Sequence, residues 1–142
     1  LYTVNQSRLE GFKQAYEQMG QKIDESMLFL ELETDDLRVQ AIGNAIEKQP
    51  DCILCMDERL TNMTMNMLKH MNVQVPQQMK VASMYDSEGL AAATPPITAV
   101  QFDADQLGRR AAQQLLQALK GREVETRVEL GYQVSMREST KT

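Results

Sequence analysis

The order of hydrophobic patterns along the chain is the feature that most limits its fold. Residues 4–19 carry apolar side chains at helical spacing, and residues 27–32 form a short, nearly continuous apolar run. Helical and strand-like segments then keep alternating to the end of the chain, without an internal repeat. Strands that alternate with helices are typical of parallel sheets, because a parallel connection must cross back along the sheet. The sequence therefore predicts an α/β fold, a three-layer architecture with a parallel sheet.

The individual elements follow from the same patterns and from their capping residues. The expected strands are 27–32, 52–56, 80–84, 97–102 and a last one within 127–137. Thr34 and Asp57 are placed to cap helices, and Gly20 and Gly121 to end them. Three helical stripes are expected to be buried: Leu37, Ala41, Ala45 and Ile46; Leu60, Met63, Met67 and Met71; and, in the helix at 104–120, Leu107, Ala111, Leu115 and Leu119.

Length and charge exclude several classes of function. The chain has 142 residues, enough for one domain or part of one, and a net charge of −5. A DNA-binding domain usually presents a basic face, so specific DNA binding by this segment is not expected. No apolar run approaches the ~20 residues of a membrane span. The first residues, "LYTVNQSRLEGF", suit neither an initiator Met nor a signal peptide, so we expect a piece of a longer protein.

Candidate catalytic and metal-binding residues are few. Cys52 and Cys55 form a C-x-x-C inside a predicted strand, where residues three apart point to opposite faces. We therefore interpret both as core thiols and not as a metal or redox pair. His70 is interpreted as a surface residue, and acidic pairs at 35–36 and at 103 and 105 as helix-start residues. With no phosphate-binding loop in the sequence, neither an enzyme nor a bound cofactor or metal is predicted.

Methionines crowd the helix that follows Asp57. Met63 and Met67 belong to its predicted core stripe, whereas Met65 points elsewhere, with Thr61 and Leu68 near its face. Methionine is adaptable and common both in cores and at association surfaces. Ordinary core packing and an interface between subunits are both consistent with this pattern.

The motifs from residue 52 onward occur in a familiar order. The chain reads Asp57, then "VASMYD" (81–86), "PPITAV" (95–100), Leu107-Gly108, "AAQQLLQAL" (111–119), Gly121 and "RESTKT" (137–142). Together with the opening "SRLEGFKQAYEQMG", they resemble the effector-binding core of lactose-repressor-type (LacI/GalR) transcription regulators. The resemblance covers essentially the whole chain.

The resemblance implies a fold and a division of the chain. It implies a fold like that of type I periplasmic binding proteins, with residues 1–142 supplying the second lobe plus a crossover strand and helix at about 98–121. The DNA-binding headpiece and the first lobe would be absent. The two prolines at 95–96 would stiffen the chain just before it crosses between the lobes.

The resemblance also implies candidate site residues. Arg8, Met56, Asp57 and Tyr85 fall at effector-binding positions. Met56 and Tyr85 stand where the family has a polar Asn and an Asp. The implied binding site is therefore more apolar than a site for sugars. The implied effector is anionic or planar, or the pocket is filled and there is none. The implied dimer interface is formed by Thr61, Met65, Leu68, Gly89 and Ala93.

These inferences converge on a binding module. The leading hypothesis is the ligand-sensing and dimerisation domain of a cytoplasmic bacterial regulator, a homodimer that reaches operator DNA only through its headpiece. The alternative on the same fold is one lobe of a periplasmic solute-binding protein for sugars. An enzyme built on a flavodoxin-like sheet is the third reading.

Overall fold

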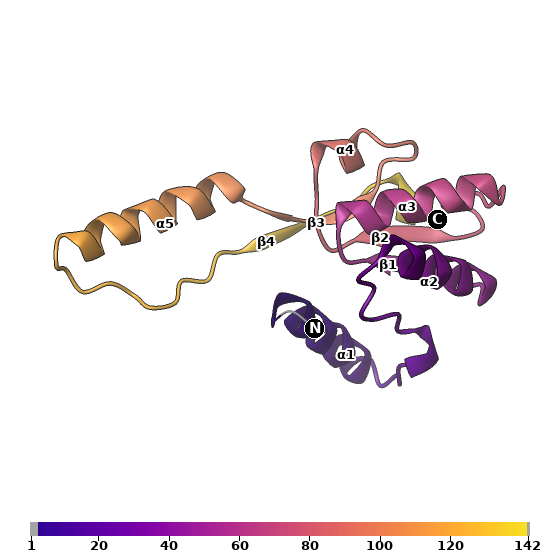
Figure 1. The fold of residues 1–142 in the computed structure, drawn as a ribbon, viewed down its shortest axis with the longest axis horizontal. Coiled ribbons are helices and arrows are strands. Elements are labelled where there is room, and N and C mark those ends of the chain that lie inside the picture. Colours follow the sequence, from indigo (N-terminus) through magenta and orange to yellow (C-terminus); the bar gives the residue numbers. More distant parts are fainter. Residues whose placement is uncertain (1–2, 142) are drawn as a thin grey trace.

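The computed structural model describes residues 3–141 of the chain, which form a mixed sheet with helices around it (Figure 1). The elements in order are α1 (Thr3–Gln18), the 3₁₀ helix η1 (Glu25–Met27), α2 (Asp35–Glu47), β1 (Cys52–Cys55), α3 (Glu58–His70), β2 (Lys80–Ser83), α4 (Glu88–Ala91), β3 (Thr98–Phe102), α5 (Ala104–Leu119), β4 (Tyr132–Ser135) and the 3₁₀ helix η2 (Glu138–Thr140). Four of the five expected strands and all four expected helices are present.

The sheet has the strand order β1-β2-β3-β4. β1 pairs with β2 and β2 with β3 in parallel, with Cys55 opposite Ser83 and Ser83 opposite Ala99. β4 instead runs antiparallel to β3, with Phe102 opposite Tyr132. The expectation of an entirely parallel sheet is therefore wrong at this strand. The reason is the connection between the two strands. After α5 the chain turns back, so β4 runs along β3 in the opposite direction, from Phe102 toward Ala99.

The apolar run at 27–32 does not form the expected strand. Leu28 donates its N–H to the Glu25 carbonyl, and Glu33 donates to the carbonyl of Glu31, so these bonds stay local. Glu31 has a φ of 58°, which interrupts an extended backbone. Met27 and Leu30 are exposed. Hydrophobicity alone does not make a strand, because its backbone groups need a neighbouring strand as partner.

Helix termini follow their predicted caps. The Thr34 hydroxyl accepts a hydrogen bond from the Leu37 N–H at 3.3 Å. The side-chain Oδ1 of Asp57 accepts one from the Leu60 N–H at 2.8 Å. Gly20 and Gly121 have φ values of 69° and 68°, and each lies just past a helix in the left-handed conformation that glycine tolerates. Local side-chain chemistry therefore fixes where these helices begin and end.

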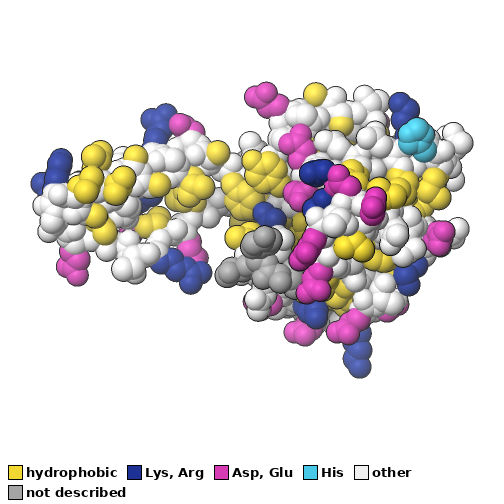
Figure 2. Space-filling view, in the orientation of Figure 1, with side chains coloured by type: hydrophobic (Ala, Val, Ile, Leu, Met, Phe, Trp, Pro, Cys, Tyr) yellow, Lys and Arg dark blue, Asp and Glu magenta, His cyan; other side chains and the backbone are white. Residues whose placement is uncertain are grey.

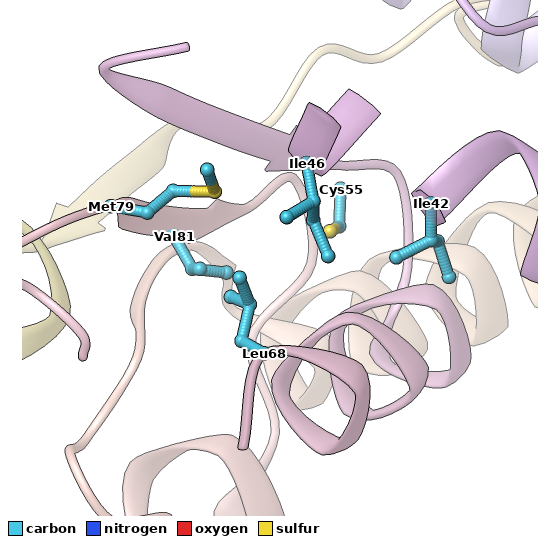
Figure 3. Close-up of a cluster of buried hydrophobic side chains, with 6 residues drawn as sticks. All are labelled: Ile42, Ile46, Cys55, Leu68, Met79 and Val81. Atoms are coloured by element: carbon cyan, nitrogen blue, oxygen red, sulfur yellow. The ribbon is translucent and has the colours of Figure 1, made fainter. Parts of the chain in front are cut away.

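The core lies between α2, α3 and the first two strands. Its buried side chains converge in Figure 3 and are Ile42, Ile46, Cys55, Leu68, Met79 and Val81. In α2, Ala41 and Ile46 are buried as expected, but Ile42 is buried too and Leu37 is 44% exposed. In α3 the buried residues are Thr61, Thr64 and Leu68. Leu60, Met63 and Met67 are only partly buried, and Met71 is exposed.

The two cysteines differ in environment. Cys55 is buried, and its sulfur lies 3.5 Å from the Thr64 hydroxyl. Burial raises the pKa of the Cys55 thiol to about 11, so it stays protonated at neutral pH. Cys52 is exposed, which corrects the expectation that both are core residues. Both thiols are free.

One part of the molecule projects away from the rest (Figure 1). We call residues 103–135 the arm; they hold α5, β4 and the segment between them. We call the region from α2 to the start of β3, together with η2, the body. The expectation that the α5 stripe of Leu107, Ala111, Leu115 and Leu119 is buried is wrong within this chain, because no residue of α5 is buried. Leu107, Leu115, Leu116 and Leu119 are each more than half exposed. Figure 2 shows hydrophobic side chains along the arm and at its junction with the body.

Candidate functional site

The carboxyl ends of β1 and β2 meet at one edge of the sheet. Because the strands are parallel and Cys55 lies opposite Ser83, the residues that follow them emerge together. The Met84 N–H donates to the Cys55 carbonyl at 2.8 Å, which extends the pairing by one step. Met56 and Tyr85, which come next in the chain, therefore lie at this carboxyl edge. Ligands of open α/β sheets generally bind at such an edge.

Arg8 reaches this edge from α1. One terminal nitrogen of its guanidinium, Nη1, donates to the Met56 carbonyl at 3.1 Å and to Asn5 Oδ1 at 3.4 Å. The side chain is partly buried. The structure thus brings together Arg8 and Met56, two predicted site residues that are 48 positions apart.

The remaining two predicted effector residues have different settings. Asp57 uses its carboxylate to cap α3, so its main contact is structural. The Tyr85 backbone is fixed by Ser83, whose hydroxyl donates to the Tyr85 carbonyl at 2.7 Å and accepts from its N–H at 3.2 Å. The Tyr85 residue is still 48% exposed. Two hydrogen bonds hold the Tyr85 backbone in place while the residue stays accessible for contact with a ligand.

Beside Tyr85 lies an ion pair that sequence reasoning missed. Both terminal nitrogens of Arg137 donate to the two carboxylate oxygens of Asp86, each at 2.7 Å. The side chains are only 19% and 9% exposed. The Arg137 hydrogen bonds hold the pKa of Asp86 below its usual range, and Asp86 in turn raises the pKa of Arg137. The "RESTKT" motif was a signal of this contact, but the motif alone did not name its partner.

The residues after Arg137 lock the end of the chain onto the sheet. The Ser139 hydroxyl donates to the Val81 carbonyl at 2.6 Å and accepts from the Thr98 N–H at 2.8 Å. The Ser139 N–H donates to the Pro96 carbonyl at 3.0 Å. Ser139 is fully buried. We call Arg137, Ser139 and their partners the clasp, because they tie β2, β3 and the loop that holds Tyr85 to the segment that returns from the arm.

A comparison with known protein families identifies the family to which the chain belongs. Residues 2–140 match the model of the periplasmic binding protein-like domain. The chain belongs to this family. Its periplasmic-binding-protein-like α/β fold is the one that the sequence motifs implied.

Individual relatives are transcription regulators. The HTH-type transcriptional repressor PurR of Vibrio cholerae is 28% identical over 127 residues, which are 87% of this chain and 37% of the relative. Among solved structures, the regulator CcpA of Lactococcus lactis matches with a TM-score of 0.87 at 19% identity, over 98% of this chain and 52% of that one. A transcriptional regulator CelR–cellobiose complex matches with a TM-score of 0.82 at 26% identity, over 93% of this chain and 41% of that one. The resemblance to lactose-repressor-type regulators is confirmed, and the chain spans about two fifths of the length of its curated relatives.

The expected dimer residues of this domain fall into two groups. Thr61 and Leu68 are both fully buried inside the chain, and the Thr61 hydroxyl donates to the Asp57 carbonyl. The expectation that these two contact a partner is therefore wrong, because they present no surface to it. Met65 and Ala93 are partly exposed and Gly89 is exposed. The body covers Thr61 because α3 packs on the sheet through this face.

Two shallow concavities lie away from the carboxyl edge. One, of about 290 Å³, lies between α1 and the segment after it and includes Lys13, Tyr16 and Glu25. The other, of about 340 Å³, lies between α2 and α3 and is lined by Val39, Ile42, Met63, Asn66, Met67 and His70. Within residues 3–141, no three His, Cys, Asp or Glu side chains are grouped to hold a metal ion. The helices of that same part of the chain include none long and apolar enough to cross a membrane.

Proposed function

We propose that this chain is the effector-sensing and dimerising part of a DNA-binding transcription regulator. The observation that carries the proposal is the contact of Arg8 with the Met56 carbonyl at the shared carboxyl edge of β1 and β2. This contact places a charged donor from α1 where open α/β sheets bind ligands. The named relatives are regulators, and one of the matching structures is a complex with cellobiose, which supports effector binding over catalysis.

The effector would bind between this lobe and a second one. Arg8, Met56 and Tyr85 form one wall in this proposal, and Asp57 supports it by capping α3. Lobe closure around the effector would stabilise one arrangement of the two lobes, and the coupling to DNA would come from the difference in affinity between the open and closed states. In a homodimer, closure would reposition the paired headpieces on operator DNA in the cytoplasm.

The arm fits this division of the protein. α5 carries an apolar stripe with no cover in the body, and large side chains left in water forfeit about 1.5–3 kcal/mol each. We propose that the first lobe of the full-length protein covers α5 and continues the sheet from the outer half of β3. Residues 98–121 would then be the crossover strand and helix. Amide hydrogen exchange should be fast along α5 in the isolated chain and slow in the full-length protein; slow exchange in both would contradict this assignment.

The proposed dimer interface uses one face of α3 together with α4 and the loop that follows α4. Met65, Gly89 and Ala93 are the residues that remain available, and small residues allow the close approach of a two-fold contact. Met65→Glu in the full-length protein should shift sedimentation toward the monomer, because a charge would be buried. The control is Asn66→Glu, which adds the same charge on the side of α3 that faces α2. If both variants sediment like the parent, another surface makes the dimer.

The regulatory role is tested by two linked measurements. Compounds that raise the melting temperature of the full-length protein are first found by thermal shift, and each is then tested for its effect on operator affinity. A compound that binds should change that affinity, since coupling between two sites is reciprocal. The isolated chain, with its net charge of −5, should form no sequence-dependent DNA complex at physiological salt. A specific complex of the isolated chain with DNA would contradict the proposal.

A further inference from the structure

The concavity between α2 and α3 brings two thioethers and an imidazole together. It measures about 340 Å³ and lies away from the carboxyl edge of the sheet. Its lining consists of Val39 and Ile42 from α2 and of Met63, Asn66, Met67 and His70 from α3. This lining contains neither a carboxylate nor a thiol. Hard ions such as Ca²⁺ and Mg²⁺ need several oxygen ligands, so the concavity does not suit them.

Met63, Met67 and His70 share one face of α3, because they are spaced four and three residues apart. Side chains at these spacings start about 5–6 Å from one another, so Met67 stands between the other two. Met63 and His70 are two turns apart, or about 10.5 Å along the helix axis at 1.5 Å per residue. Long side chains from the two ends can therefore meet above Met67. The zinc motif H-E-x-x-H likewise places two ligands one helical turn apart.

The packing of the two methionines holds them at the concavity without covering them. Both are partly buried, pack against the core cluster and still line the concavity. The Met67 sulfur lies over Gly43 of α2, 4.0 Å from the position that a Cβ atom would take there. His70 is exposed, and within residues 3–141 it takes part in no ion pair. No carboxylate of these residues therefore competes for the imidazole.

Core packing explains these side chains only in part. The positions that α3 buries hold Thr61, Thr64 and Leu68, whereas the methionines lie at the boundary with α2 and stay accessible. Leucine usually replaces methionine in such positions at little cost, so filling space does not require sulfur. An imidazole at the exposed end of an otherwise largely apolar lining is not required for packing either. What the three side chains share is the ability to bind a soft metal ion.

We propose that Met63, Met67 and His70 bind one Cu(I) ion in the concavity between α2 and α3. Thioether sulfur selects Cu(I) over harder ions, and imidazole is also a suitable ligand for copper. A monovalent ion brings a single positive charge into a lining that holds no acidic group to balance a second one. The sequence did not predict this site because its methionines read as core residues and its histidine as a surface residue. The site is separate from the carboxyl edge, so the proposal does not depend on the effector function.

Competition for Cu(I) tests the site in the full-length protein. Bicinchoninate, a coloured Cu(I) chelator, is titrated against the protein under argon, with ascorbate to keep the metal reduced. Exposed thiols, including Cys52, are alkylated first, because thiolates also bind Cu(I). The protein should take one equivalent of Cu(I) from the chelator. Zn²⁺, measured in the same way with a zinc indicator, should bind at least tenfold more weakly at this site, since two of the three ligands are thioethers.

Variants assign the binding to named side chains. Met67→Leu, Met63→Leu and His70→Gln should each weaken Cu(I) binding about tenfold or more, since changes even to groups behind metal ligands cost about 10–100-fold. Met71→Leu is the matched control, because Met71 follows α3 directly but lies outside the concavity. It should leave the affinity unchanged. Circular dichroism checks that each variant is folded, and the two separate leucine variants guard against the failure of one.

A second readout follows the methionine methyl groups by nuclear magnetic resonance. Addition of Cu(I) to protein labelled at the methionine methyls should shift the signals of Met63 and Met67, which their leucine variants assign, and leave that of Met71 in place. Equal Cu(I) affinity in the parent, Met67→Leu and His70→Gln would overturn the proposal. A loss in Met71→Leu as large as in Met67→Leu would also overturn it, because binding would then depend on methionine content and not on this site. Failure of the alkylated protein to compete, or Zn²⁺ binding as tight as that of Cu(I), would equally overturn it.

Discussion

Helices α3 and α5 show how one sequence pattern can lead to opposite environments. Both begin after an Asp that caps the first turn, Asp57 and Asp103. Both carry apolar residues at helical spacing. α3 lies in the body and buries Leu68 completely, whereas in the arm Leu115 is 61% exposed. Amphipathic spacing therefore tells which face of a helix needs cover, but not whether the same chain provides it.

The boundary between these two environments falls within a single strand. β3 starts with Thr98 and Ala99, which are buried, and ends with Phe102, which is 46% exposed. The clasp sits at the buried end, where the Thr98 hydroxyl accepts the Arg137 N–H at 2.8 Å. The body is thus closed by specific polar contacts at the point where the arm leaves it.

The largest difference between body and arm should appear on truncating a buried leucine. Leu68→Ala should lower the free energy of unfolding of the isolated chain by about 4 kcal/mol, because it leaves a cavity among Ile46, Cys55 and Val81. Urea denaturation measures this. A loss below about 1 kcal/mol, the usual effect of a well-tolerated substitution, would mean that the core repacks or is loosely formed.

The clasp should be the next most sensitive feature. Asp86→Asn should cost about 3 kcal/mol, because it leaves the largely buried Arg137 guanidinium without its counter-charge. Asp35→Asn is the matched control: it breaks exposed pairs with Arg38 and Arg59 and should cost less than about 1 kcal/mol. Equal losses in the two variants would show that the clasp does not close the body as proposed.

Local features of the fold could be predicted from the sequence because they depend on neighbouring residues. The caps at Thr34 and Asp57 and the glycine ends at Gly20 and Gly121 need only a few residues of context. Arg8 at the carboxyl edge came from the family resemblance and agrees with its contact to Met56. The effector and interface roles of these residues stay predictions.

Features that depend on distant partners could not be predicted. The Asp86–Arg137 pair joins residues 51 positions apart. The buried face of α3 was misassigned because its threonines find polar partners inside the body: Thr61 bonds the Asp57 carbonyl and Thr64 lies beside the Cys55 sulfur. By hydrophobicity alone, the methionines of α3 were expected in the core in place of the threonines. A hydroxyl that has a hydrogen-bond partner can nevertheless be buried.

Acidification should remove the stabilising contribution of the Asp86–Arg137 ion pair of the clasp. The folded-state pKa of Asp86 is lowered by Arg137, so its stabilisation is fully present above the unfolded carboxyl pKa of about 3.9 and is lost as the pH falls through the lower folded value. Urea midpoints between pH 7 and pH 2 should therefore converge for the parent and Asp86→Asn at the acid end. Parallel curves over the whole range would contradict a lowered pKa.

The smallest effect is expected in the arm, and it is the sharpest test of the contrast with the body. In the isolated chain, Leu115→Ala should change the free energy of unfolding by less than about 0.5 kcal/mol, since an exposed side chain has no packing to lose. In the full-length protein the same substitution should cost about 2 kcal/mol or more, the range for a leucine that becomes buried. Urea denaturation of both proteins gives the two values, with Leu68→Ala as the reference that should be costly in each. A loss of more than about 1 kcal/mol in the isolated chain would show that α5 folds back on the body or pairs with a second copy. A substitution without effect in the full-length protein would instead mean that α5 stays exposed there and that the proposed first lobe does not cover it.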